Sequence, residues 1–407
     1  MRSSAAKALA TADLARLPRV LGVYPASGAP ATSGEKLGTL LFVVGGIHGN
    51  EPAGVRAMRT VFAELEKLAP PIHGRVVGLV GNAGALAAGR RFLRQDLNRL
   101  WTDERLGTLV DPCTTSDGLD AGPEAAEQRE LLRTFLEHMR EPWERVVLLD
   151  LHSTSAGGAP FTIISDTLQN RPVAFALPVP VLLGLEERIE GTLLSWFADQ
   201  GHVALCLEGG QNDLPSTVDH HVAAIWLTLA SAGLVAPEHL PALAAQRERL
   251  ENSARDLPPV VELRYRFGIP DGAVFEMRPG FQNFQPVRRG EVLASMDPGS
   301  GAREVQSPIA GRVLMPRYQT LGDDGFFLGR EVRAFWLRLS ELVRRAHLSW
   351  AVRLLPGVRR SAGHPRALVV DRRIARWFTV EILHLFGYRW RSREGRRVVF
   401  LRRPDAV

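Results

Sequence analysis

The sequence of 407 residues contains little cysteine, and this scarcity limits the kinds of site that it can form. Only Cys113 and Cys206 are present. Two cysteines are too few for a disulfide framework or for a zinc site built from thiolates. Any metal ion bound by this chain must therefore be held by imidazole and carboxylate groups.

Long apolar runs are also missing. No run approaches the roughly 20 apolar residues that cross a bilayer. The N-terminus begins with basic residues, but Asp13 and Arg16 interrupt the apolar centre that a signal peptide requires. Apolar and charged fractions of 45% and 23% are ordinary for a folded chain and argue against disorder. We therefore expect a cytoplasmic protein that does not associate with a membrane.

Lysine is scarce, and the positive charge is unevenly distributed. Lysine occurs only at positions 7, 36 and 67, so nearly all cations are arginines. After residue 330 there are 18 arginines against 6 acidic residues, a surplus of 12 positive charges. Because the whole chain has a net charge of +6, the first 330 residues carry a net −6. Any attraction to nucleic acid would therefore concern the C-terminal part and not the main body.

The order of apolar segments predicts the fold class. Strands are expected at 37–46, 74–82, 144–152, 161–165, 179–186 and 202–210, and helices at 52–68, 125–139 and 218–235. Such alternation indicates a mixed, mainly parallel α/β sheet flanked by helices.

The length predicts two or three domains. We expect an α/β domain with the catalytic site over residues 1–240 and a smaller β-rich C-terminal capping domain over 258–335. Residues 336–407 form a basic extension of unknown role, with a helix predicted at 371–387 and a hairpin at 388–403.

Polar residues follow several of the predicted strands. His48 and Glu51 lie in "GGIHGNEPAG" after the first strand, "RRFLRQDLNR" lies in a loop, and His152 and Glu208 end later strands. Ligands of open α/β sheets bind beyond the carboxyl ends of the strands. Each of these residues also has an ordinary structural explanation, as a turn, a strand end or a loop ion pair. Their combination at the same edge favours a functional site.

The residue types indicate a metal site. His48 and Glu51 are three positions apart, so on one helical turn they point to the same side. With His152 they make two imidazoles and one carboxylate, which leaves a position for water and is typical of catalytic zinc. Zinc would lower the pKa of that water to about 7, and Glu208 could move its protons. The expected cofactor is one Zn²⁺ per chain.

The four motifs "GGIHGNEPAG", "RRFLRQDLNRLW", "DLHSTS" and "LEGGQ" occur in the order seen in a known family. Over about residues 38–335 the sequence resembles the succinylglutamate desuccinylase/aspartoacylase family of zinc-dependent acylases, a branch of the zinc carboxypeptidase fold. The resemblance implies hydrolysis of the amide bond of a small N-acyl amino acid. It also implies that the β-rich segment belongs to the family's C-terminal domain.

The resemblance assigns roles to individual positions. It implies that His48, Glu51 and His152 bind zinc, and that Glu208 is the general base that later protonates the leaving amine. It implies that Arg91 stabilises the oxyanion. Asn98 and Arg99 match the pair that binds the substrate carboxylate, for which the arginine fork is suited. Asp96 is expected to shape this loop.

Several positions remain open. Asp150 either orients His152 from behind or pairs with an arginine, and Cys206 is interpreted as a buried thiol. Tyr318 could reach the site, although a packed strand aromatic is the preferred interpretation. The family's aspartoacylases have a further arginine before the catalytic glutamate, which "SWFADQGHVALCLE" lacks. Selectivity for N-acetylaspartate is therefore not expected.

Three other functions share features with this sequence. A metallocarboxypeptidase would use the same zinc and glutamate, but would need an open groove where the deacylase needs a capped site. A biotinyl or lipoyl carrier is excluded because "MDPGSGARE" has no lysine at the hairpin where such a carrier needs one.

A binding protein could use the Arg-rich extension on nucleic acid, with Trp377, Phe378 and Trp390 stacking on bases. We favour instead a small subdomain with these aromatics in its core. The sequence does not decide whether the chain forms a homo-oligomer.

Overall fold

The structure is a computed structural model that describes residues 14, 17–26, 36–110, 122–240, 242–299, 301–361, 364–371, 374, 379–394 and 397–404. Cys113, Trp377 and Phe378 lie outside the described residues. Within these ranges no helix has both the length and the apolar character needed to cross a membrane.

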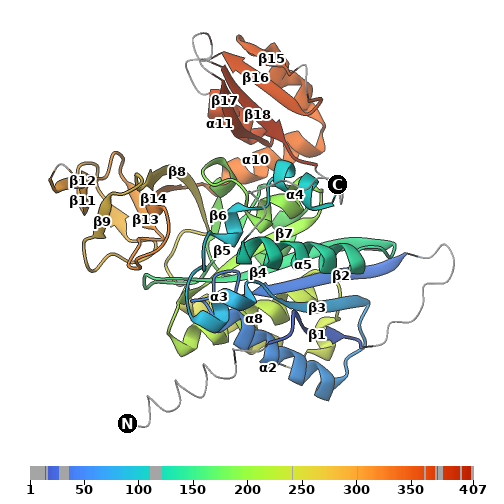
Figure 1. Cartoon of the computed structure of the whole chain (residues 1–407). Helices are drawn as coiled ribbons and strands as arrows, with labels where there is room; N and C mark the ends of the chain where they lie inside the picture. Colours follow the sequence, from blue (N-terminus) through green and yellow to red (C-terminus); the bar gives the residue numbers. More distant parts are fainter. Residues whose placement is uncertain are drawn as a thin grey trace.

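Among the described residues, one sheet of eleven strands organises the main body, which Figure 1 shows. Its strands, in spatial order, are β1 (Val20–Tyr24), β3 (Gly74–Val80), β2 (Leu37–Gly45), β4 (Trp143–Thr154), β7 (Val203–Gln211), β5 (Phe161–Ile164), β6 (Val181–Leu183), β8 (Val260–Gly268), β14 (Asp324–Glu331), β13 (Gly311–Leu314) and β10 (Pro286–Val287). Strands β3, β2, β4 and β7 run parallel, and β1 and β5 flank them antiparallel. The predicted central α/β sheet is confirmed. Its strands are parallel in the region where the polar residues follow them.

Helices cover both faces of the central strands. They are α2 (Ala53–Leu68), α3 (Ala83–Ala88), α4 (Asp103–Val110), α5 (Pro123–His138), α6 (Asn170–Ala176), α7 (Leu193–Asp199), α8 (Pro215–Ser231) and α9 (Leu243–Ser253), with short 3-10 turns η1 (Leu97–Arg99), η2 (Leu185–Glu187) and η3 (Pro237–His239). Alternate residues of β2 enter two separate cores. Leu41 and Val43 pack with α2 and α8, whereas Phe42 packs with α5 and α7 on the other face. The strand is therefore apolar throughout, as the sequence shows.

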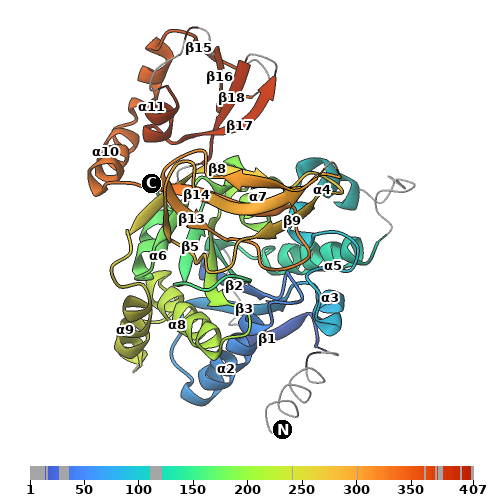
Figure 2. The same ribbon diagram turned by 90° about the vertical axis from the view of Figure 1, so that its left-hand side faces the viewer.

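The β-rich segment continues the same sheet. Strand β8 pairs in parallel with β6, and β14, β13 and β10 follow by antiparallel pairing. A second sheet of three strands, β12 (Arg303–Gln306), β11 (Val292–Asp297) and β9 (Val274–Met277), shares an apolar core with them. Figure 2 shows β8, β9, β13 and β14 above β2 and β3 in that view. The loops between them consequently approach the polar ends of β4 and β7.

The C-terminal extension forms its own layer (Figure 1). It consists of α10 (Ala334–Arg345), η4 (Leu348–Leu354), α11 (Thr379–Leu385) and a sheet in the order β15 (Val358–Arg360), β16 (Ala367–Asp371), β18 (Arg397–Arg402), β17 (Tyr388–Glu394). A separate apolar core, against which Trp390 packs, holds it together. The predicted hairpin is confirmed. The predicted helix at 371–387 is wrong at its start, because Asp371 pairs with Arg397 as the last residue of β16.

Candidate metal and substrate site

The turn after β2 brings His48 and Glu51 together. The backbone N–H of Glu51 donates to the His48 carbonyl at 3.1 Å, which closes the turn just before α2. Gly46 has φ +73°, a conformation that favours glycine. Gly49 lies so close to the backbone of Ala85 that a Cβ there would collide with it. The glycines of the motif are therefore required by the turn that aims both side chains.

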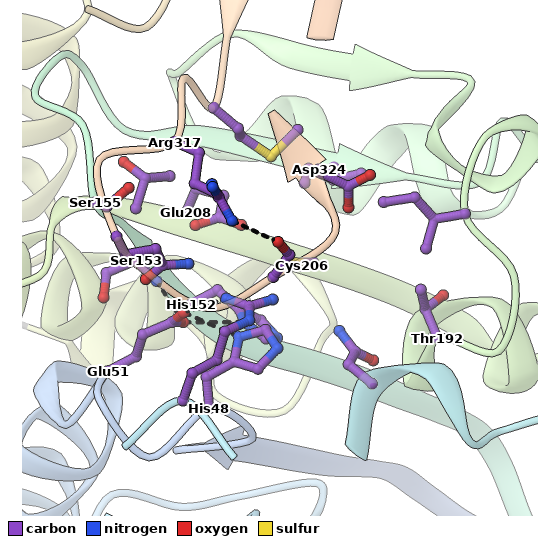
Figure 3. A pocket seen from close by; sticks show the side chains of 18 of the residues that line it. His48, Glu51, His152, Ser153, Ser155, Thr192, Cys206, Glu208, Arg317 and Asp324 are labelled. Carbon is purple, nitrogen blue, oxygen red and sulfur yellow. Dashed lines mark hydrogen bonds and ion pairs between the residues drawn. The ribbon is translucent and has the colours of Figure 1, made fainter. Parts of the chain in front are cut away.

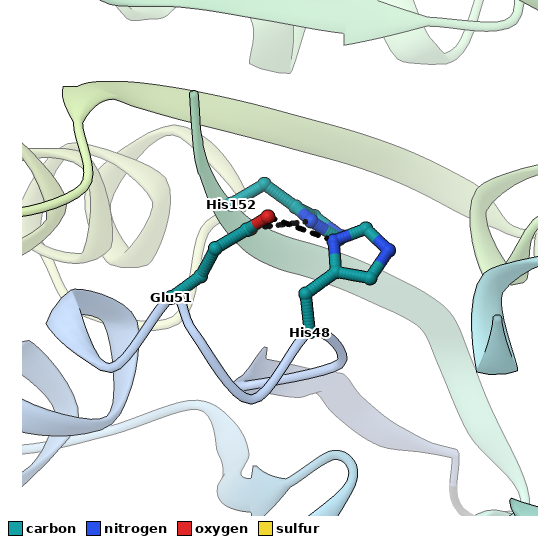
Figure 4. A group of neighbouring side chains, drawn as sticks. All are labelled: His48, Glu51 and His152. Atoms are coloured by element: carbon teal, nitrogen blue, oxygen red, sulfur yellow. Dashed lines mark hydrogen bonds and ion pairs between the residues drawn. The ribbon is translucent and has the colours of Figure 1, made fainter. Parts of the chain in front are cut away.

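His48, Glu51 and His152 form one buried cluster, shown in Figure 4. His48 Nδ1 lies 2.9 Å from Glu51 Oε1, and His152 Nδ1 lies 3.1 Å from Glu51 Oε2. One possible ligand atom from each residue falls within 4.8 Å of the others. Both Nδ1 atoms thus converge on the same carboxylate. Burial raises the pKa of Glu51, but the two histidines outweigh it and the net pKa is lowered.

Two further carboxylates hold the outer nitrogens of these histidines. Asp96 Oδ1 lies 3.1 Å from His48 Nε2, and Asp150 Oδ2 lies 3.0 Å from His152 Nε2. This arrangement leaves each Nδ1 lone pair for a ligand and fixes the orientation of both rings. Asp150 therefore orients His152, since its carboxylate contacts the His152 imidazole, and it pairs with no arginine among the described residues. Asp96 additionally accepts the backbone N–H of Asn98 at 2.9 Å, which shapes the loop as expected.

Glu208 lies beside the cluster, on β7. Its backbone pairs with that of His152 across the parallel strands. The buried Oε2 atom has no hydrogen-bond partner among the described residues. Burial raises the pKa of Glu208 to about 7, opposed by His152 and reinforced by Glu51. The site thus offers two imidazole nitrogens and a carboxylate, with an unpartnered carboxylate oxygen beside them. A catalytic zinc and its water would satisfy this set of donors.

Arg91, Asn98 and Arg99 line the same cavity as the cluster and Glu208. Figure 3 shows the cluster and Glu208 in this cavity. Arg91 donates to Asp96 Oδ2 at 3.0 Å and to Glu51 Oε1 at 3.4 Å. The side-chain carbonyl of Asn98 accepts the backbone N–H of Leu193 at 2.9 Å, which leaves its amide NH₂ as a donor. All seven residues proposed from the sequence are therefore gathered around one cavity.

The cavity also contains residues that sequence reasoning missed. Asp324, at the start of β14, accepts from Arg99 Nη2 at 3.0 Å and from Arg266. Arg317 contributes to the lining and donates to the carbonyl of Gly322 at 2.8 Å. No motif or spacing marks these residues. They reach the cavity only because β14 and its preceding loop pack over the central sheet.

Cys206 takes the buried position expected for it, whereas Tyr318 is an exposed loop residue and not the packed strand aromatic that was preferred. The Tyr318 hydroxyl donates to the Arg278 carbonyl at 2.7 Å and accepts from the Phe281 N–H at 2.9 Å. Its backbone N–H donates to Ser155 Oγ, which ties this loop to the end of β4. Cys206 is buried in the cavity wall, and burial raises the pKa of its thiol.

The fold and the site together define an α/β protein with a buried His–Glu–His cluster suited to a divalent metal ion. Residues 38–219 match the sequence model of the succinylglutamate desuccinylase/aspartoacylase catalytic domain. This part of the chain, residues 38–219, therefore matches the succinylglutamate desuccinylase/aspartoacylase family, as the four motifs predict.

Relatives with curated names match over part of their length. The succinylglutamate desuccinylase of Pseudomonas putida is 32% identical over 155 residues, which are 38% of this chain and 42% of that protein. The succinylglutamate desuccinylase of Burkholderia pseudomallei is 36% identical over 72 residues, 18% of this chain and 20% of that protein. The matches thus span less than half of these relatives.

Solved structures share the fold. A succinylglutamate desuccinylase/aspartoacylase from Rhodobacter sphaeroides has a TM-score of 0.53 at 18% identity, covering 74% of this chain and 87% of that one. The product-bound ectoine utilization protein EutE (DoeB) from Ruegeria pomeroyi has a TM-score of 0.50 at 20% identity, with coverages of 72% and 87%.

Proposed function

We propose that this protein is a zinc-dependent hydrolase that cleaves the amide bond of an N-acyl amino acid. The observation that supports it most directly is the buried cluster of His48, Glu51 and His152, with Glu208 beside it in one cavity. The match to the family, whose relatives include enzymes named succinylglutamate desuccinylase, supports the same reaction class.

The cluster and Glu208 would divide the chemistry between them. His48, Glu51 and His152 would hold zinc, which when bound polarises a carbonyl and lowers the pKa of water. Glu208, with its pKa raised to about 7, is suited to take a proton from the attacking water and to return it to the leaving amine.

The arginines would bind the charged parts of the substrate. Arg91 lies beside Glu51, where its guanidinium can donate to the oxyanion that forms at the scissile carbonyl. Asn98 and Arg99 would bind the substrate carboxylate. Because Asp324 already accepts from Arg99, a bound carboxylate must share this guanidinium with it. This contact holds Arg99 in place before the substrate arrives.

The covering of the site favours a small substrate over a peptide. Met315, Arg317 and Gln319, which precede β14, line the cavity together with the ends of β4 and β7. Gln319 accepts from the Asn50 amide at 3.0 Å, so this loop contacts the ligand-bearing turn itself. A metallocarboxypeptidase would need this side open for the rest of a peptide.

The proposal can be tested by metal analysis combined with a panel of substrates. We expect about one zinc ion per chain and release of amine from N-acyl amino acids with a free carboxylate. Short peptides with free C-termini should not be cleaved. Release of C-terminal residues from the peptides instead would establish the carboxypeptidase, and absence of bound zinc would contradict both functions.

A separate prediction concerns Asp150. Asp150→Asn keeps the shape of the side chain but removes the negative charge next to His152 Nε2. We expect zinc affinity to fall by about 10- to 100-fold, because the imidazole becomes a weaker ligand and is less firmly oriented. Competition with a chelator of known affinity measures the change. The exposed Asp219→Asn on α8 serves as the control, and equal zinc affinities in the two variants would contradict the assignment.

A further inference from the structure

The segment from residue 184 to 193 forms one wall of the cavity, and we call it the pocket-wall segment. It leaves β6, makes the short turn η2 and enters α7. Leu185, Ile189 and Thr192 line the cavity from this segment. Its position therefore decides how much room a substrate has beside the cluster.

The same segment braces the loop that would bind the substrate carboxylate. Leu193 N–H donates to Asn98 Oδ1 at 2.9 Å, and the Gly191 carbonyl accepts from Trp101 N–H at 3.0 Å. Gly191 has φ +69°, and a Cβ on it would collide with the carbonyl of Arg99. Any displacement of the segment would thus move Asn98 and Arg99 as well.

The C-terminal extension holds this segment from the side away from the cavity. Glu187 Oε1 lies 3.0 Å from His384 Nε2 and 3.4 Å from Arg389 Nη1, and the three side chains are only 6–11% exposed. Glu186 lies 3.7 Å from Arg403 Nη1. Two adjacent carboxylates of the wall are therefore paired with a histidine of α11, an arginine of β17 and an arginine just after β18.

The same three residues also pair with carboxylates elsewhere in the main body. His384 Nδ1 lies 2.7 Å from Glu262 on β8, and Arg389 donates to Glu262 at 2.9 Å. Arg403 Nε donates to Asp199, at the end of α7, at 2.7 Å. The pairing is consistent with the charges of the two parts, since the first 330 residues carry a net −6 and the remainder a net +12.

We propose that the C-terminal extension is a positioning element for the substrate pocket: through His384, Arg389 and Arg403 it fixes the pocket-wall segment and, through it, Asn98 and Arg99. This inference rests on the proposed deacylase function of the cavity. None of the three cations lines the cavity, so they act through the wall and not on the substrate. The extension thereby contributes to substrate specificity.

Two variants test this role from opposite sides of the contact. Arg403→Ala removes the cation that faces Glu186 and Asp199, and Glu187→Gln removes the charge that faces His384 and Arg389. We expect KM for the best N-acyl amino acid to rise about tenfold, with kcat within about twofold, because orientation is lost while Glu208 and the metal ligands stay in place. Arg403→Lys should recover part of the loss. Arg360→Ala, on the exposed face of β15, is the matched control.

Amide hydrogen exchange provides a readout that does not depend on activity. In both variants the amides of the pocket-wall segment should exchange faster, while those of β7 should not change. Unchanged exchange in the segment, or a fall in melting temperature with an unchanged KM, would show that the contacts only stabilise the extension and would overturn the proposal. If the unaltered protein hydrolyses no N-acyl amino acid, the proposed function fails, and the exchange pattern still decides the positioning role.

Discussion

Replacing Glu208 by glutamine is expected to lower kcat by about 10²- to 10⁴-fold while zinc remains bound. Glutamine has the size of glutamate, so the buried position beside His152 should tolerate it. The glutamine amide cannot accept a proton from water. Glu208 can do so near neutral pH, because its pKa is about 7. Because Glu208 is not a member of the His48, Glu51 and His152 cluster, metal binding should persist.

Two measurements separate this effect from general damage. Metal analysis of the variant should give the same zinc content as the parent protein, and its melting temperature should be close to that of the parent. Glu64→Gln, on the exposed face of α2, is the matched substitution and should retain full activity. Near-normal turnover by the Glu208 variant would mean that another group moves the protons.

The sequence predicted the centre of the site because simple geometry places it there. His48 and Glu51 follow β2, while His152 and Glu208 lie near the ends of β4 and β7, and these three strands are parallel neighbours. Residues at the carboxyl ends of parallel neighbours must meet at one edge of the sheet. Apolar strands and the order of the motifs were therefore sufficient for this part of the molecule.

The surroundings of the site could not be predicted in the same way. The contact of Asp324 with Arg99 depends on how β14 folds back over the sheet, 225 positions further along the chain. The partners of Arg389 and His384 depend on the docking of an entire extension. Charge patterns show that the extension is basic, but they do not show which carboxylate an individual arginine will approach. Long-range pairings of this kind follow from tertiary packing alone.

The position of the extension also changes the interpretation of its charge. Arg344, Arg389 and Arg403 are directed at carboxylates of the main body and are largely buried. Trp390 packs against the core of the extension, as in the preferred of the two interpretations. These groups are occupied within the chain, so an attraction for nucleic acid would have to rest on other arginines.

Asp166, which follows β5, is the anion on which this docking most depends, and we expect Asp166→Asn to destabilise the protein by about 3–5 kcal/mol. Its carboxylate pairs with Arg171 at 2.8 Å, with Arg389 at 2.9 Å and with Arg344 at 3.4 Å. Asparagine has a similar size but no charge. Three buried guanidinium groups would therefore lose a shared counter-charge, although Arg389 keeps Glu262, and a loss of neutralising charge beside buried cations is costly.

The same cluster should make the docking sensitive to pH in both directions. Burial raises the pKa of Asp166, but the three arginines outweigh it and the net pKa lies well below its usual range. The pKa of Glu262 is likewise lowered to about 2 against the effect of burial, chiefly by His384 and Arg389. Stability from these carboxylates is complete above their unfolded pKa values of about 4 and is lost as the pH falls further.

The pKa of His384 is raised, because its carboxylate partners outweigh burial and Arg389. Its contribution is therefore complete below about pH 6.5 and is lost as the pH rises through the raised value.

Calorimetry and limited proteolysis with trypsin can measure the effect of Asp166→Asn. We expect a lower melting temperature and faster cleavage after arginines of the extension, because undocking exposes a segment with 18 of them after residue 330. The control is Asp213→Asn, an exposed aspartate before α8, which should match the parent protein in both assays. Since the loss arises from the missing negative charge, lowering the pH below about 4 should destabilise the parent more than the variant, so that the difference between their melting temperatures narrows. If Asp166→Asn leaves the melting temperature and the cleavage rate unchanged, Asp166 is not the anion that holds the extension in place.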